Sequence, residues 1–95
     1  MERLGEFKRV DFVESIPHKL EYGTVYIDKT TYGSAVFLSP DGSKRVVNVR
    51  LKPAFKSGIK WKVNDGVKIT FMSPIRRPGT KNEKFTVMDN KITFL

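Results

Sequence analysis

The chain has no cysteine, only one histidine and no long apolar run, and each absence removes a class of protein. Without cysteine there is no disulfide, no thiolate nucleophile and no thiolate metal site. No window approaches the roughly 18 apolar residues of a membrane-spanning helix, and the N-terminal residues lack the apolar core of a signal peptide. We therefore expect a soluble, cytoplasmic protein that is stabilised by packing, by sheet hydrogen bonds or by self-association into a homodimer.

The residues that enzymes use are scarce. The only imidazole belongs to His18, which follows Pro17 in an expected turn, and no glycine-rich phosphate loop occurs. A nucleophile needs a neighbouring base, and a zinc site needs three or four suitable ligands. Most aspartates stand in turn contexts, where their side chains bond the local backbone. The sequence therefore predicts no enzyme, no cofactor and no metal site.

Length and composition indicate one folded domain. The chain has 95 residues, of which 39% are hydrophobic and 12% aromatic. That is enough apolar surface for a folded core, but a chain of this length seldom holds two cores. We expect a single β domain over residues 1–95.

Three segments have the pattern of β-hairpins, in which alternating apolar and polar residues flank a turn rich in proline, glycine, asparagine or aspartate. Their expected strands and turns are residues 35–38 and 45–51 around 39–43, residues 61–63 and 67–71 around 64–66, and residues 85–88 and 91–95 around 89–90.

Two further strands are expected at residues 7–13 and 22–27, which are rich in β-branched and aromatic residues. Residues 52–60 and 73–84 are expected to be loops, with a short helix over 53–60 as the alternative for the first. The predicted fold class is all-β: a small antiparallel barrel or sandwich built from hairpins, with six to eight short strands. The barrel would be OB-like or SH3-like, and the sandwich would pack two sheets together.

The formal net charge of +8 is unevenly distributed. Residues 1–40 contain five basic and six acidic side chains, whereas residues 41–95 contain thirteen basic and only four acidic ones. This segregation predicts one positive face, which attracts polyanions: nucleic acid first, an acidic protein surface second. Membrane attachment is not expected, because neither a basic amphipathic helix nor a lipidation motif is present.

The candidate nucleic-acid-binding residues lie in this basic part, on or near strands and in the loop 73–84. They are Arg50, Lys52, Lys60, Lys62, Arg76, Arg77, Lys81 and Lys84. Exposed aromatic rings on which bases stack would favour single strands. The stacking candidates are Tyr22, Tyr26, Tyr32 and Phe55. The competing interpretation is structural, since lysines often protect strand edges and tyrosines on strands are often packed.

The order of several motifs resembles a family of small, uncharacterised β-rich proteins of bacteria and phages, some encoded beside ubiquitin-like conjugation components. The motifs are FVESIP at 12–17, LEYGTVYI at 20–27, YGSAVFL at 32–38, WKVNDGVKI at 61–69, SPI at 73–75 and DNKITF at 89–94. Members of that family usually carry a Cys/His cluster that resembles a zinc site, but residues 39–43 and 81–85 here contain neither residue type. The resemblance implies a β fold, a metal-free member and a bacterial or phage setting, with the host cytoplasm as location if a phage encodes it.

Two hypotheses for function follow. The first is a non-enzymatic basic binding module that contacts single-stranded nucleic acid through its C-terminal part. The alternative is a phage or bacterial accessory protein that binds a virion component or a host factor and has no nucleic-acid role.

Overall fold

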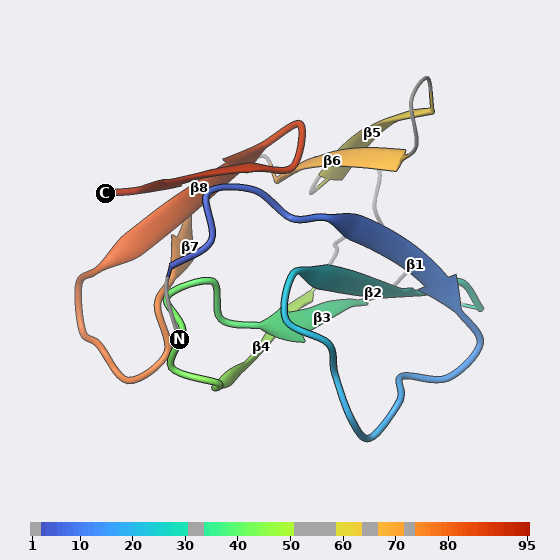
Figure 1. The fold of residues 1–95 in the computed structure, drawn as a ribbon, viewed down its shortest axis with the longest axis horizontal. Coiled ribbons are helices and arrows are strands. Elements are labelled where there is room, and N and C mark those ends of the chain that lie inside the picture. Colours follow the sequence, from blue (N-terminus) through green and yellow to red (C-terminus); the bar gives the residue numbers. More distant parts are fainter. Residues whose placement is uncertain (1–2, 31–33, 51–58, 64–66, 72–73) are drawn as a thin grey trace.

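The structure is a computed structural model that describes residues 3–30, 34–50, 59–63, 67–71 and 74–95. These residues form nine short strands and contain no helix, which confirms the predicted all-β class (Figure 1). The strands are β1 (Arg9–Val13), β2 (Thr24–Asp28), β3 (Ser34–Leu38), β4 (Val46–Arg50), β5 (Ile59–Val63), β6 (Val67–Phe71), β7 (Ile75–Arg76), β8 (Lys84–Met88) and β9 (Lys91–Phe94).

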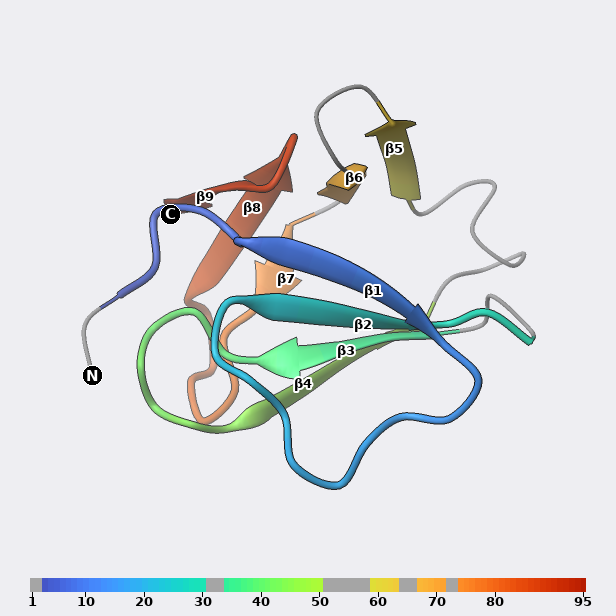
Figure 2. The same cartoon turned by 45° about the vertical axis from the view of Figure 1, so that its right-hand side comes forward.

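The N-terminal half forms a four-stranded sheet in the order β1-β2-β3-β4. The predicted hairpin of β3 and β4 is confirmed, with Ala35 opposite Val49 and Phe37 opposite Val47. Gly42 takes a φ of 83° in its turn, a conformation that glycine adopts without strain. One pairing departs from the expected hairpins, because β1 runs parallel to β2. A parallel pair needs a longer connection than a hairpin turn, and residues 14–23 supply it (Figure 2).

The C-terminal strands form a second antiparallel sheet in the order β7-β8-β9. The predicted β8–β9 hairpin is confirmed, and its two turn residues, Asp89 and Asn90, have φ values of 47° and 69°. Positive φ at both positions is the signature of a type I′ turn. The prediction of one continuous loop over 73–84 was wrong, since β7 lies inside it and pairs with β8 through Ile75 and Phe85.

The hairpin of β5 and β6 is also confirmed, with Trp61 opposite Ile69 and Val63 opposite Val67. Its predicted turn lies outside the described residues, as do residues 52–58 of the expected loop and of its helical alternative. Residues 59 and 60, the last two residues of the expected loop, belong to β5.

Asn90 joins β6 to the β8–β9 turn. Its backbone N–H donates to the Ile69 carbonyl, and its side-chain Oδ1 accepts the Ile69 N–H, both at 2.8 Å. Asn90 thus forms with Ile69 the pair of hydrogen bonds that a residue of a neighbouring strand would form. The Asn90 carbonyl also accepts from the Phe7 N–H at 2.8 Å, and the Ile92 N–H donates to the Gly5 carbonyl at 2.9 Å. Residues 5–7 therefore extend the sheet beyond β9.

The core lies between the sheets and is centred on Phe37. The Phe37 ring lies 5.0 Å from the ring of Phe7, 6.0 Å from Phe71 and 6.2 Å from Phe85, and Phe37, Phe7 and Phe85 are almost completely buried. These contacts join both main sheets and β6 around one cluster. The sheets do not close into a barrel, so the arrangement is sandwich-like (Figures 1 and 2).

Among the described residues, no helix has the length and apolar character needed to cross a bilayer.

Candidate polyanion-binding surface

The β7–β8–β9 sheet has a core-facing side and an outer face, set by the alternation of side chains along paired strands. The core-facing residues are buried or half-buried: Ile75, Phe85, Val87, Ile92 and Phe94. The register pairs the alternate residues with one another. The outer face consists of Arg76, Lys84, Thr86, Met88, Lys91, Thr93 and Leu95.

The outer face is basic and partly apolar. Arg76, Lys84 and Lys91 are exposed, and none forms an ion pair with another residue in the described part of the chain. Met88 is 67% exposed and Leu95 68% exposed, which is unusual for large apolar side chains. Cations interleaved with exposed apolar groups suit a ligand that has both negative charge and flat apolar surface.

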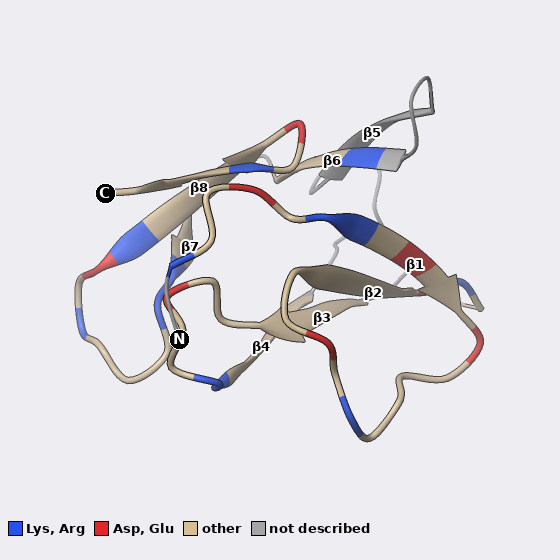
Figure 3. Cartoon of the chain, viewed as in Figure 1, with Lys and Arg blue, Asp and Glu red and all other residues tan. Residues whose placement is uncertain are grey.

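Two loops at one end of this sheet add further positive charge. They are residues 39–45, between β3 and β4, and residues 77–83, between β7 and β8. The loops touch, because the Arg45 side chain lies directly against Gly79. Any side chain at position 79 would start only 3.0 Å from Arg45 Cζ. Lys44, Arg45 and Lys81 are exposed here and, within the described ranges, form no ion pair. Figure 3 shows basic segments in both loops and at the adjoining ends of β7 and β8. We call these three residues together with Arg76, Lys84 and Lys91 the basic surface.

Arg77 is the exception among the cations of this end. Its Nη2 lies 3.1 Å from Asp41 Oδ2 and its Nη1 lies 2.8 Å from Glu83 Oε2, and its side chain is only 16% exposed. Two carboxylates already hold the guanidinium of Arg77, so we leave it out of the basic surface, and its predicted role in binding stays a prediction. Arg77 ties the two loops together. The choice of Arg76 is compatible with the structure, since its side chain is exposed.

The surroundings of Asp41 keep its carboxyl group ionised at neutral pH. Its side chain is 6% exposed, and burial opposes the charged form. Hydrogen bonds from the Ser43 side chain and backbone and from Arg77 outweigh that effect and lower the pKa of Asp41 to about 2. The ion pair between the loops is thus present throughout the neutral range.

Among the other predicted cations, the structure describes the side chains of only two. Lys81 and Lys84 are exposed and belong to the basic surface. Arg50 lies in β4 opposite Ser34, and Lys60 and Lys62 lie in β5 opposite Thr70 and Lys68, but only their backbone positions are described. Lys52 lies outside the described residues.

The predicted stacking residues do not form an exposed aromatic platform in the part of the chain that is described. Tyr26 was a wrong choice: it is 5% exposed, and its hydroxyl accepts the Glu21 N–H at 3.0 Å. Tyr22 is half-buried, and its hydroxyl donates to the Pro40 carbonyl at 2.8 Å. Burial and the nearby Asp41 carboxylate raise the pKa of Tyr22. Tyr32 and Phe55 lie outside the described residues.

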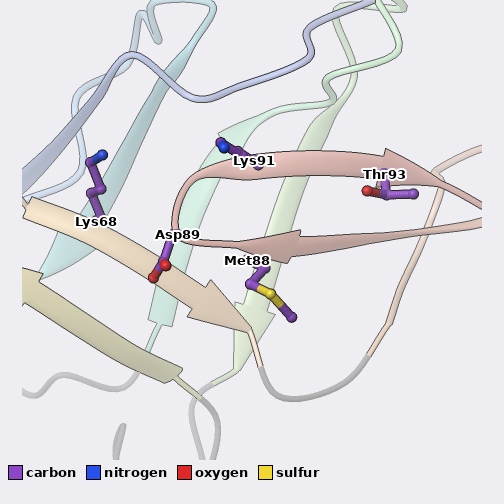
Figure 4. Close-up of a pocket in the computed structure, with 5 residues that line it drawn as sticks. All are labelled: Lys68, Met88, Asp89, Lys91 and Thr93. Carbon is purple, nitrogen blue, oxygen red and sulfur yellow. The ribbon is translucent and has the colours of Figure 1, made fainter.

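A hollow of about 360 Å³ lies where β6 meets the β8–β9 hairpin. It is lined by Lys68, Met88, Asp89, Lys91 and Thr93, which come from β6, from the end of β8, from the turn and from β9 (Figure 4). No function was predicted for these residues from the sequence. The available signal was their strand alternation, which places Met88, Lys91 and Thr93 opposite the apolar core positions.

Comparisons with protein-family models, with curated proteins and with solved structures found no match to this chain. The resemblance to the bacterial and phage family stays a prediction.

Proposed function

We propose that this protein is a non-enzymatic binding module that contacts single-stranded nucleic acid through its basic surface and the adjoining outer face. The observation that carries the proposal is the group of exposed cations without a carboxylate partner among the described residues, spread over the outer face and the two loops. Such cations neutralise phosphates and release counterions, which supplies affinity that depends steeply on salt.

The exposed apolar groups favour a single strand over a duplex. Met88 and Leu95 stand on the same face as Lys84 and Lys91, so they offer contact surface to unstacked bases. In a duplex the base faces are stacked on one another and unavailable for such contacts. Phosphate contacts alone would bind both forms.

The test is a fluorescence-anisotropy titration of a labelled single-stranded oligonucleotide and of its duplex at two salt concentrations. The double variant Arg76→Ala/Lys84→Ala should weaken binding and reduce the slope of log affinity against log salt by about 1–2 units. The matched control is Arg9→Ala/Lys29→Ala, which removes the same charge from cations that already have carboxylate neighbours. Equal effects of the two double variants would contradict the proposed surface.

An acidic protein surface is the second candidate ligand, because exposed Met88 and Leu95 would also suit a protein contact. An unlabelled acidic peptide in the same titration separates the two ligands. Competition by the peptide at micromolar concentration, with no oligonucleotide binding at low salt, would favour the protein partner.

A further inference from the structure

The hollow beside the β8–β9 turn is held by contacts between residues distant in sequence. Asn90 bonds both backbone groups of Ile69, and the Thr70 hydroxyl accepts the Asp89 N–H at 2.9 Å. These bonds fix the turn against β6. They bring Lys68, on β6, to the same hollow as Met88 and Lys91, which are opposite one another across the hairpin.

The lining combines three kinds of group. Lys68 and Lys91 supply two ammonium groups, Met88 supplies an exposed thioether, and Thr93 supplies an exposed hydroxyl (Figure 4). The carboxylate of Asp89 offsets part of the positive charge and also accepts a 3.4 Å hydrogen bond from the Thr70 hydroxyl. The ligand that fits best is therefore an anion that also carries a group with an apolar surface and with atoms that can form hydrogen bonds.

The size of the hollow limits the ligands that it can hold. Its volume of about 360 Å³ is at the lower end of the roughly 300–1,000 Å³ of small-ligand sites. The hollow also continues into the outer face, since Met88 and Thr93 belong to both. A unit of a longer chain that follows the outer face towards Lys84 and Arg76 can therefore enter it.

We propose that the hollow is a subsite for one nucleotide unit of the bound single strand. The base packs against the Met88 thioether within reach of the Thr93 hydroxyl, and the adjoining phosphate lies between Lys68 and Lys91. Methionine sulfur makes favourable contacts with aromatic rings, so it replaces the aromatic platform that the described residues lack. This inference rests on the proposed function and adds to it the position at which a base is contacted.

The direct test is methyl NMR of protein labelled at the methionine methyl groups. The chain has three methionines, and a Met88→Leu variant identifies the signal of Met88. The probes are tetrathymidylate and an abasic tetramer with the same number of phosphates. The proposal expects tetrathymidylate to shift the Met88 signal and the abasic tetramer to leave it nearly in place.

Each other outcome has a defined meaning. If anisotropy shows oligonucleotide binding while the Met88 signal stays unchanged, the subsite is overturned and the proposed function stands. Equal shifts with both tetramers would overturn the base contact. No binding of either tetramer at low salt would overturn the proposed function itself, and a Met88 shift with an acidic peptide alone would assign the hollow to a protein ligand.

A variant series supplies the energetic test. Met88→Ser should weaken tetrathymidylate binding roughly two- to tenfold and leave abasic binding unchanged. Lys91→Ala should weaken both and lower the salt slope by about 0.7. Val46→Ser is the matched control, because Val46 is also a large exposed apolar side chain, at 58%, but it lies in β4 and lines neither the outer face nor the hollow. Equal losses in Met88→Ser and Val46→Ser would overturn a localised subsite, provided thermal unfolding shows that all variants fold.

Discussion

The β1–β4 sheet and the outer face of the β7–β9 sheet both carry charged side chains, but they use them differently. In and beside the first sheet, two cations are paired: Arg9 lies 3.0 Å from Asp11 and 3.6 Å from Glu21, and Lys29 lies 3.7 Å from Glu14. Lys8 and Lys19 are exposed there and form no ion pair within the described ranges. On the outer face the cations have no such partner among the described residues. The difference teaches that net charge alone does not show which cations are available to a ligand. The surface that we propose for polyanion binding consists of exposed cations that form no ion pair within the described ranges.

The largest expected effect is the loss of single-strand affinity when the charges of the outer face are reversed. Arg76→Glu/Lys84→Glu should lower single-strand affinity about a hundredfold or more at low salt, because two phosphate contacts become repulsions. Arg9→Glu/Lys29→Glu changes the net charge equally but should cost less than tenfold. Anisotropy at fixed salt measures both. Similar losses would mean that only the total charge matters.

The second prediction concerns the attachment of β6 to the outer face. Asn90→Ala should lower the free energy of unfolding by about 2–3 kcal/mol, because the buried Ile69 N–H loses its acceptor and alanine is strained at a φ of 69°. Urea unfolding measures the change. Asn90→Gly removes only the hydrogen bond, so its loss should be smaller, and an equal or larger loss in the glycine variant would contradict the strain argument.

The third prediction compares two neighbouring arginines, Arg76 at the end of β7 and Arg77 at the start of the following loop. Arg77→Ala should lower the free energy of unfolding by about 1–2 kcal/mol, because Asp41 and Glu83 lose their shared partner, and it should leave the salt slope of binding unchanged. Arg76→Ala should do the reverse, with stability within about 0.5 kcal/mol of the parent protein and a lower slope. The prediction fails if both variants change the same quantity.

The last prediction concerns the acid sensitivity of the ion pair between the loops. The pKa of Asp41 falls from 3.8 to about 2 on folding, so its ionised form stabilises the folded state above about pH 4. That contribution, on the order of 2 kcal/mol, is lost as the pH falls through 2. Urea midpoints of the parent protein and of Asp41→Asn, measured from pH 5 to pH 2, should therefore converge at the acid end. A difference that stays constant would show that Asp41 acts through another route.

The three hairpins could be predicted because their determinants are local. In the β8–β9 hairpin, Asp89 and Asn90 tolerate positive φ, and alternating residues flank them. The parallel β1–β2 pairing could not be predicted, since it depends on a connection of irregular structure and on contacts with the rest of the sheet. β7 was missed because two residues give no period, and only pairing with β8 makes them a strand.

The sequence indicated where exposed cations lie but not how each one is paired. The uneven charge pointed to residues 41–95, and Arg76, Lys81 and Lys84 from that part are exposed in the structure. Sequence could not distinguish Arg76 from Arg77, because the partner Asp41 comes from a distant turn. It also could not show that Tyr26 is buried, since a strand of apolar and aromatic residues does not reveal which side is covered.

The bridge between Glu6 and Lys91 has a kinetic consequence. It pairs segments from opposite ends of the chain, so forming it requires closure of a very long loop before any contact offsets that entropy. Small β proteins dominated by such distant pairings refold in milliseconds to seconds rather than microseconds. The sheet that carries the outer face should therefore gain its last neighbour late, after the local hairpins have formed.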